Sequence, residues 1–414
     1  MDRKQAFEGI KVADFSWAAV GPIVARELAE HGATVIHVES HRVPGLERLA
    51  GPFKGFKPGI DRGAFGICYN TNKLGISLDL NKPKGQEVAK RLVKWADVMT
   101  DSMSPGTMAK WGLDYESARK IKPDIIYYSA TLGGQYGPYA KFQGYGAQGA
   151  ALAGMYSVTG WPDRSPAYIF GAYTDYIGPY FLVCALVAAL DYRRRTGKGI
   201  YLDLSQWEAA INFLGPAILD YVVNGRIATR MGNRRPDAAP HSAYQCMGTD
   251  RWVAIAVHTD EEWKAFCKVI GEPEWTRDAK FATLLGRKRS EDELDKLVGE
   301  WTINHTPEEV MFQMQAAGVP AGVVQNCQDL FEDPQLKHRG HFQWLNHKVM
   351  GPVAHNAPAY QAFKTPCRLV KAGPCLGEDN AYVYKEILGY SDDDIADLLV
   401  EGVITTGADL PGLG

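Results

Sequence analysis

Short apolar runs and amphipathic stretches alternate along the first 130 residues of the chain. Apolar runs at residues 9–16 and 34–40 have the length and flanking residues of buried strands. The stretch between them, residues 22–33, repeats apolar positions at helical spacing and ends near Gly32. Further elements are predicted downstream: a helix at 85–95, a strand at 97–101, a short helix at 117–121 and a strand at 124–130. Strand, helix and strand in this order predict right-handed crossovers and a parallel sheet.

The pattern changes near residue 225. Turn-forming residues and arginines dominate residues 224–241, and a predicted hairpin at 243–257 turns at a Gly-Thr-Asp sequence. Two or three helices are expected between this hairpin and residue 317, and a last helix at 392–399. We therefore expect an α/β protein with a large doubly wound parallel-sheet domain and a smaller α+β domain. The expected boundaries are 1–224 for the first part of the large domain, 225–335 for the small domain and 336–414 for the return to the large domain.

Composition and charge exclude several classes of function. The 414 residues are 46% apolar and 22% charged, the net charge is −3, and no long run of like charges occurs. Nucleic acid is therefore not an expected partner. The longest apolar run, residues 181–190, is shorter than the roughly 20 residues that cross a bilayer, so it predicts a buried helix and no membrane partner. The first residues contain no apolar signal core, and we expect a cytoplasmic location.

Cysteine spacing and glycine motifs argue against bound metals and nucleotide cofactors. The seven cysteines are dispersed, with no Cys-x-x-Cys pair, which predicts reduced thiols and no metal site. The turn after the first predicted strand, residues 16–22, lacks Gly-x-Gly-x-x-Gly, and no phosphate-loop lysine motif occurs. No resident cofactor is expected.

The candidate for chemistry is Asp175, in the segment 171–178 directly before the long apolar run. An aspartate at a helix start lies beside unpaired backbone N–H groups and the positive end of the helix dipole, which would keep its carboxylate ionised. The flanking Gly171 and Gly178 would let other groups approach closely. The same pattern is also typical of an aspartate that only caps a helix.

A series of short segments in a fixed order accompanies Asp175: Val12–Phe15 with Gly21–Pro22, 32–40, Asn70–Leu80, Ala96–Val98, Ser104–Gly106, Gly134–Pro138, Arg195–Gly199, Gly232–Asn233, Gly318–Ala321, Asp333–Leu336 and Leu376–Glu378. Through these segments the chain resembles the class III CoA-transferase family, which includes formyl-CoA, carnitine and benzylsuccinate CoA-transferases. The resemblance implies that residues 1–224 begin a CoA-binding domain. It also implies an interlocked, ring-like dimer, formed by two copies of the chain or by two related subunits, with each active site at the subunit interface.

The resemblance implies a covalent mechanism at Asp175. In the family, the aspartate at this position attacks an acyl-CoA thioester and forms an acyl-aspartyl anhydride, then an aspartyl-CoA thioester. An acceptor carboxylate reverses the steps, so coenzyme A is part of the substrate rather than a cofactor. Succinyl-CoA is a common donor in the family.

The resemblance also places CoA contacts along the chain, with several departures from the family pattern. Ser40 stands where the family often has an arginine, Ser102 and Met103 replace an Asn-Phe pair, and Lys110 replaces an arginine. The full set of expected CoA-binding residues is Ser40, Arg42, Leu78, Ser102, Met103, Lys110, Gln143, Gly144 and Gly146.

Three positions bear on the acid substrate. Trp17 and Ala19 stand where formyl-CoA transferase has a histidine and a glutamine, and Tyr145 belongs to a group of tyrosines around Asp175. These residues predict a bulky or aromatic acid rather than formate or oxalate. Ordinary packing of the aromatic side chains is the alternative.

Two other functions are compatible with the same family resemblance. An α-methylacyl-CoA racemase would need a Gly-His-Asp motif, but the chain reads Gly144-Tyr145-Gly146 at that position, so the catalytic imidazole is missing. The chain could instead be a CoA-binding subunit of a heteromeric transferase, although the presence of Asp175 favours a catalytic role.

Overall fold

The computed structural model describes residues 4–169 and 171–405. The chain forms two compact units, each coherent in itself. Unit 1 comprises Met1–Met155, Ile169–Val222 and His338–Gly414, and unit 2 comprises Tyr156–Tyr168 and Val223–Lys337. The sequence-based division, which placed residues 156–168 in the large domain, stays a prediction.

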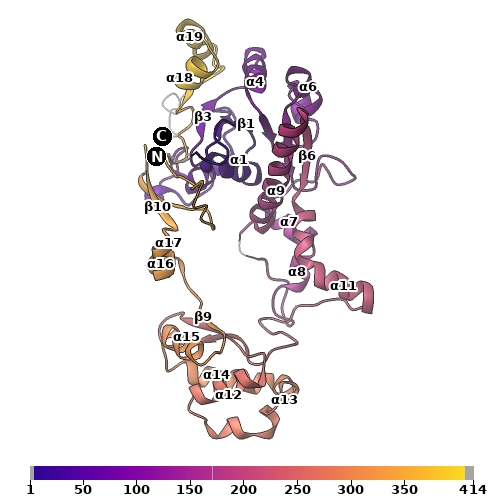
Figure 1. The fold of residues 1–414 in the computed structure, drawn as a ribbon, viewed down its shortest axis with the longest axis vertical. Helices are drawn as coiled ribbons and strands as arrows, with labels where there is room; N and C mark the ends of the chain where they lie inside the picture. The colour runs from indigo at the N-terminus through magenta and orange to yellow at the C-terminus, as the bar shows by residue number, and fades with distance from the viewer. Residues whose placement is uncertain (1–3, 170, 406–414) are drawn as a thin grey trace. The chain divides into compact units, whose positions relative to one another are not determined.

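Unit 1 is built on a six-stranded sheet in the order β3-β2-β1-β4-β5-β6 (Figure 1). The strands are β1 (Lys11–Phe15), β2 (Thr34–Glu39), β3 (Leu74–Ser77), β4 (Val98–Asp101), β5 (Ile126–Thr131) and β6 (Ile200–Ser205). Every pairing is parallel, which confirms the predicted parallel sheet. From β1 the chain first adds strands on one side of the sheet, β2 and β3, and then on the other side, β4, β5 and β6, so the strand order reverses between β1 and β4. Ligands of such sheets bind beyond the carboxyl ends of the strands at this point.

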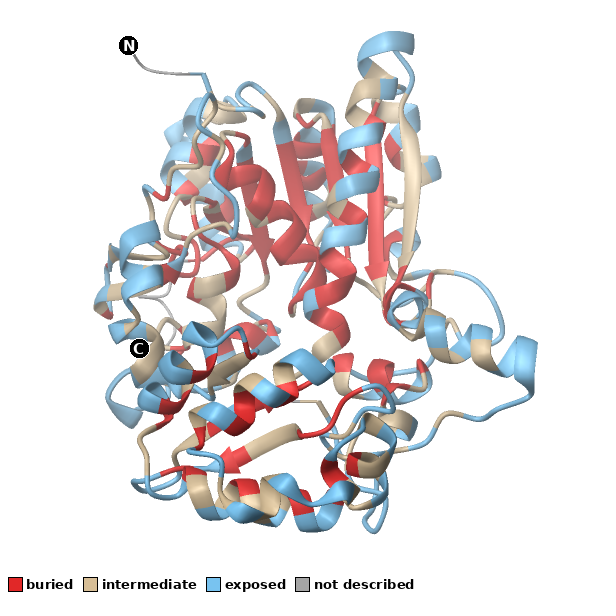
Figure 2. Ribbon diagram, turned by 60° about the horizontal axis from the view of Figure 1, so that its bottom comes forward, coloured by how far each residue is buried: buried red, intermediate tan, exposed pale blue. Residues whose placement is uncertain are grey.

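Helices cover both faces of this sheet because successive strand residues point to opposite sides. Val12 belongs to a core that includes side chains of α1 (Val20–Glu30) and α9 (Tyr173–Thr196). Ala13 and Phe15 belong to the other core, with α4 (Pro83–Trp95) and residues near the carboxyl end of the chain. Figure 2 shows these central strands and helices as the buried part of the unit.

The remaining elements of unit 1 are short or close to the chain ends. They are α2 (Leu46–Leu49), α3 (Ala64–Tyr69), α5 (Thr107–Lys110), α6 (Tyr115–Ile121), α7 (Gly146–Leu152), α10 (Gln206–Ile211), α11 (Gly215–Asn224), β10 (Phe342–His347), β11 (Gly351–Asn356), α18 (Asn380–Tyr382) and α19 (Asp392–Val400). The helices α8 (Met155–Val158) and α17 (Pro334–Arg339) lie where the chain passes between the units. Ser77 donates its backbone N–H to Asn380 Oδ1 at 3.0 Å, so the end of the chain packs on β3.

Unit 2 contains an antiparallel sheet of β7 (His241–Gln245), β8 (Trp252–Ala256) and β9 (Ala321–Val323). The predicted hairpin corresponds to β7 and β8 and is confirmed. Four α-helices lie between the hairpin and residue 317, α12 (Asp260–Val269), α13 (Leu284–Arg289), α14 (Glu291–Thr302) and α15 (Pro307–Ala316), and α16 (Cys327–Glu332) follows β9. The expectation of two or three was wrong because the charged stretch around Ser290 separates two helices, α13 and α14.

Helix α9 is longer and less buried than its sequence predicted. Over the predicted buried segment, Leu182, Leu186 and Ala189 are buried at helical spacing, whereas Phe181 and Val187 are more than 40% exposed. By length and composition alone this helix could cross a membrane, a test that core helices of soluble proteins also pass. It packs against α1, α7, α10 and β6 in unit 1.

Candidate active site

A cavity of about 780 Å³ lies in unit 1 at the carboxyl ends of β1, β4 and β5. Seven of the residues predicted from the sequence line it: Trp17, Ala19, Ser102, Gln143, Gly144, Tyr145 and Asp175. These residues come from separate parts of the chain, so the fold brings the predicted nucleophile and all three predicted substrate residues to one cavity.

Asp175 lies in the first turn of α9 but does not cap it, because Ala172 occupies the N-cap position. The Asp175 carboxylate accepts the backbone N–H of Gly146. A Cβ at Gly146 would lie 2.7 Å from Asp175 Cγ and 2.7 Å from the Ala172 carbonyl oxygen, so only glycine fits there. The close approach that the sequence assigned to Gly171 and Gly178 is therefore made at Gly146.

Burial controls the protonation of this carboxyl group. Asp175 is 9% exposed. Desolvation raises its pKa to about 7, and the Gly146 N–H opposes that shift only in part. At pH 7 only about half of the Asp175 carboxyl groups are therefore ionised, whereas the position at the helix start had suggested a fully ionised group. Among the described residues that line the cavity, none is a lysine, arginine or histidine that could offset the burial.

Ser102 fixes the turn that carries Trp17. The Trp17 backbone N–H donates to Ser102 Oγ at 2.9 Å, and Ser102 Oγ donates to the Trp17 carbonyl oxygen at 2.9 Å. The next residue, Ala18, has a φ of 66°, a left-handed conformation that costs a non-glycine residue about 1 kcal/mol. Its N–H donates to Glu47 Oε2 at 2.9 Å, which holds that conformation. The sequence did not indicate Ala18 or Glu47, because the contact joins segments 29 residues apart.

A buried ionic network lies beneath this turn. Asp14 Oδ2 accepts from Lys73 Nζ at 2.7 Å and lies 3.0 Å from His37 Nδ1. All three side chains are fully buried. Although burial opposes it, Lys73 and His37 hold the pKa of Asp14 well below its usual range. The network anchors the carboxyl ends of β1 and β2 in a fixed position.

His37, Glu39 and Glu47 lie close enough together to suggest a metal site. Arg48, however, donates to both carboxylate oxygens of Glu39, through Nε and Nη2. A cation at this point would compete with the guanidinium, so the geometry favours the ion pair over a bound metal.

The other predicted CoA contacts follow the same edge of the sheet without lining the cavity. Ser40 and Arg42 come after β2, Met103 after β4, and Lys110 ends α5 with its side chain exposed. Leu78, directly after β3, is 1% exposed, and its N–H donates to the Glu39 carbonyl oxygen at 2.7 Å. Gly146 contributes its N–H to Asp175. CoA binding by these residues stays a prediction.

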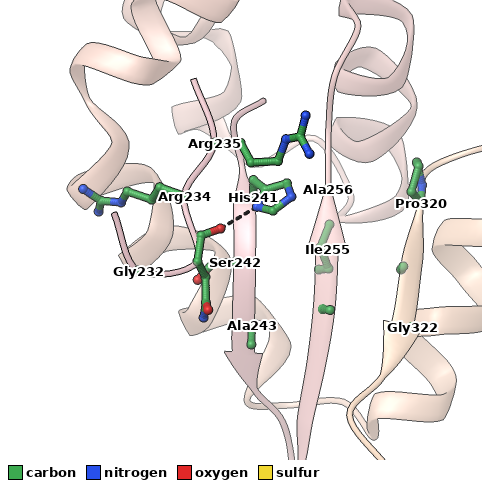
Figure 3. A pocket seen from close by; sticks show the side chains of 13 residues that line it. Gly232, Arg234, Arg235, His241, Ser242, Ala243, Ile255, Ala256, Pro320 and Gly322 are labelled. Atoms are coloured by element: carbon green, nitrogen blue, oxygen red, sulfur yellow. Dashed lines mark hydrogen bonds between the residues drawn. The ribbon is translucent and has the colours of Figure 1, made fainter. Parts of the chain in front are cut away.

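Unit 2 has a separate cavity of about 620 Å³ on its sheet (Figure 3). Its arginines are already paired within the unit. Arg234 Nη2 donates to Asp292 Oδ1 at 2.6 Å, and Arg235 donates through Nε and Nη2 to the two carboxylate oxygens of Asp237, each at 2.9 Å. His241 Nδ1 bonds to the Asn233 carbonyl oxygen. None of the predicted site residues lines this cavity, so the Asp175 cavity is the candidate active site.

Residues 7–380 of the chain match the model of the family described as "CoA-transferase family III". The chain belongs to this family. The succinyl-CoA–D-citramalate CoA-transferase of Chloroflexus aurantiacus is 30% identical over 399 residues, which cover 96% of this chain and 98% of the relative. The succinyl-CoA:glutarate CoA-transferase of Mus musculus is 29% identical over 404 residues, which cover 97% and 91%.

The crystal structure of a CaiB/BaiF family protein from Brucella suis is also similar to this class III CoA-transferase. Its TM-score is 0.85, at 30% identity, over 93% of this chain and 100% of that protein. Together these findings confirm that the chain is an enzyme of CoA transfer. They confirm the family resemblance.

The cavity of this CoA-transferase also contains residues that the sequence analysis missed. Leu46, Leu49 and Phe142 line it with exposed apolar side chains, and Gln206 lines it with a buried amide. Leu46 and Leu49 are the ends of the four-residue helix α2 and flank Glu47 and Arg48, and Gln206 follows a strand that was not predicted. The local pattern therefore gave no signal for these residues.

Proposed function

We propose that this enzyme moves CoA from an acyl-CoA donor, such as succinyl-CoA, to a carboxylic acid through covalent intermediates on Asp175. The observation that supports the proposal is the buried Asp175 carboxylate in the cavity, held by the Gly146 N–H with a pKa raised to about 7. A carboxylate of this basicity is a stronger nucleophile than an exposed one and is still largely ionised at slightly alkaline pH.

The proposed steps need no external proton. Asp175 attacks the thioester carbonyl, the C–S bond breaks, and CoA thiolate leaves a mixed anhydride on Asp175. The thiolate then attacks the Asp175 carbonyl and releases the donor acid as its carboxylate, which gives the aspartyl-CoA thioester. An acceptor carboxylate attacks the carbonyl of that thioester, the C–S bond breaks, and CoA thiolate leaves a second mixed anhydride between the acceptor and Asp175. The thiolate then attacks the acceptor carbonyl of this anhydride, which forms the new acyl-CoA and releases Asp175 as a free carboxylate. Both kinds of intermediate hydrolyse in water, so burial of Asp175 also protects them.

The cavity lining supports a bulky or aromatic acceptor acid. Trp17, Phe142 and Tyr145 offer aromatic surface, and Leu46 and Leu49 add aliphatic surface. Among the described lining residues no cationic side chain is available to pair with a second carboxylate. Citramalate and glutarate, the acids in the names of the two relatives, each carry two carboxylates. Succinyl-CoA, the proposed donor, carries a second carboxylate as well, so the lining bears on the acceptor through its apolar surface alone and favours an acid with an apolar body.

Exposed apolar helices support an assembly of at least two subunits. None of the residues of α11 is buried, and Leu219, Tyr221 and Val222 are each more than 55% exposed. Such a surface is typical of a subunit interface. The partner is a second copy of this chain or a related subunit, and the interlocked, ring-like dimer of the family resemblance is the arrangement that we propose. Leu219→Glu should lower the mass measured by light scattering, whereas Val400→Glu, at an 88% exposed position of α19, should not.

Racemisation is not favoured by the cavity. Among its described lining residues there is no histidine beside Asp175 that could act as a second base. A purely CoA-binding subunit remains the other candidate. The purified chain should exchange labelled succinate into succinyl-CoA by itself; activity that requires a second polypeptide would support the subunit function instead.

The decisive experiment traps the intermediate. Wild-type protein incubated with succinyl-CoA and hydroxylamine should yield a hydroxamate on the peptide that contains Asp175, detected by mass spectrometry. Asp175→Asn is the matched control and should yield none. Modification of Cys184 or of a serine in place of Asp175 would reject the mechanism.

A further inference from the structure

Gln206 lies beside Asp175 and has no role in the reaction as described so far. It is the first residue of α10, directly after β6, and its side chain lines the Asp175 cavity. The residue is 8% exposed. A glutamine at such a buried position carries two amide hydrogens and a carbonyl oxygen that all need partners.

Contacts with α9 fix the direction of this amide. Gln206 Oε1 accepts from Thr174 Oγ1 at 3.1 Å. Gln206 Cγ lies 3.7 Å from the position that a Cβ on Gly178 would take, an ordinary van der Waals distance, so the side chain lies against α9. Thr174 directly precedes Asp175, and its single hydroxyl hydrogen is shared between Gln206 Oε1 and the Gly146 carbonyl oxygen, each at 3.1 Å. Gln206, Thr174, Gly146 and Asp175 therefore form one connected set of side-chain and backbone groups.

The donor end of the Gln206 amide is unused. With its carbonyl oxygen on Thr174, its Nε2 has no hydrogen-bond partner within residues 4–169 and 171–405. The Thr131 hydroxyl, which is buried, likewise has no partner in that same described part of the chain. Thr131 lines the cavity and pairs with Ser205, the neighbour of Gln206, across β5 and β6. Two unpaired polar groups thus border the cavity that holds Asp175.

The reaction supplies a partner for such a donor. Every step at Asp175 adds a nucleophile to a carbonyl carbon and places a negative charge on its oxygen. A lysine or arginine here would pair with Asp175 and weaken it as a nucleophile, whereas a neutral amide leaves the carboxylate free. An amide held in place before the reaction also needs no reorganisation when the charge develops.

We propose that the Gln206 amide donates to the acyl oxyanion formed next to Asp175 and is thus a catalytic residue of the transfer. This inference rests on the proposed function of Asp175. The hydrogen bond from Thr174 makes Thr174 a positioning residue for Gln206, and Thr131 lies where it can assist from the adjacent strand.

The test is the single-turnover rate at which succinyl-CoA acylates Asp175, followed by rapid quench and mass spectrometry. Gln206→Met keeps the length of the side chain and removes its donor, so acylation should slow by about 100-fold or more with less than about a threefold change in the donor KM. Gln86→Met is the matched control, because Gln86 is a partly buried glutamine of unit 1 whose amide donates to the Leu80 carbonyl oxygen. Its acylation rate should equal that of the wild type.

Thr174→Val provides a second measurement that does not depend on the folding of the first variant. It preserves shape and removes the hydroxyl that orients Gln206, so acylation should slow by about tenfold. Equal acylation rates in wild type and Gln206→Met, or an effect on KM alone, would overturn this inference and leave Asp175 as the nucleophile. Absence of any adduct on Asp175 in the wild type would overturn the proposed function and this inference together.

Discussion

Replacing Asp175 by asparagine should inactivate the enzyme and stabilise its fold. Asparagine keeps the shape of the side chain and can still accept the Gly146 N–H, but it carries no charge to desolvate. The pKa of Asp175 is raised from its ordinary value of 3.8 to about 7 because the group is buried. The folded state therefore holds the proton more tightly than the unfolded state, and its stability falls as the pH rises from 3.8 towards 7.

The size of this effect follows from the difference in pKa. A difference of about 3 corresponds to about 4 kcal/mol once both states are ionised, and to about 2 kcal/mol at pH 5, where the folded carboxyl is still protonated. Asp175→Asn should remove this penalty. Its gain in melting temperature over the wild type should be several degrees at pH 8 and clearly smaller at pH 5.

Differential scanning calorimetry of both proteins at pH 5, 6.5 and 8 measures the gain directly, and succinate exchange on the same samples confirms the loss of activity. Asp191→Asn is a control, because this aspartate is exposed and lies on the same helix. A gain that is the same at pH 5 and pH 8, or a loss of stability at pH 8, would show that Asp175 carries no burial penalty. The reasoning about its raised pKa would then be wrong.

Three further predictions concern catalysis. The rate of Asp175 acylation should rise about fivefold from pH 6 to 7 and less than twofold from pH 7 to 8, because the ionised fraction of a carboxyl with a pKa of about 7 rises from about 9% to 50% to 91%. Gly146→Ala should lower kcat by about 100-fold or more, since its Cβ would push against Asp175 Cγ and the Ala172 carbonyl. Trp17→Ala should lower kcat/KM for an aryl acid by about thirtyfold, equivalent to about 2 kcal/mol of lost burial, and leave small acids nearly unchanged.

Each of these predictions has a distinct contrary result. A flat profile of the acylation rate between pH 6 and 8 would mean that Asp175 is already fully ionised. Wild-type kcat in Gly146→Ala would mean that the backbone at residue 146 does not constrain the nucleophile. Equal losses on aryl and small acids in Trp17→Ala would make Trp17 a packing residue. Gly299→Ala, at a glycine with open space around it, controls for the substitution at Gly146.

Local sequence patterns were sufficient for much of the sheet. The strands β1, β2, β4 and β5 are mainly apolar and are buried along almost their whole length, and α1 and α4 show clear helical spacing, so burial and periodicity agree there. The strand β3 was not predicted, because it has only four residues and contains Gly75. The strand β6 was also missed, since most of its residues are only half-buried and its composition is mixed.

The candidate site was predictable in part. Family resemblance singled out Asp175, whereas its local sequence alone favoured a helix cap, a role that the structure gives to Ala172. The partners of Asp175 depend on contacts between distant segments: Gly146 is 29 residues away, and Gln206 lies in a separate helix. No pattern within one segment reports such distances. The raised pKa likewise depends on burial by the whole unit, which a sequence without its fold does not reveal.

The two hydrogen bonds between Ser102 and Trp17 join the loops after β4 and β1, where the two halves of the sheet meet. Both bonds involve only the main chain of Trp17, so they are indifferent to the side chain at that position. The Ser102 side chain is therefore needed to hold the two loops together, whereas the side chain at residue 17 can change the acid that the cavity accepts without breaking these bonds. Directed evolution towards a new acid should therefore diversify position 17 and keep Ser102 unchanged, and most members of such a library should retain the fold.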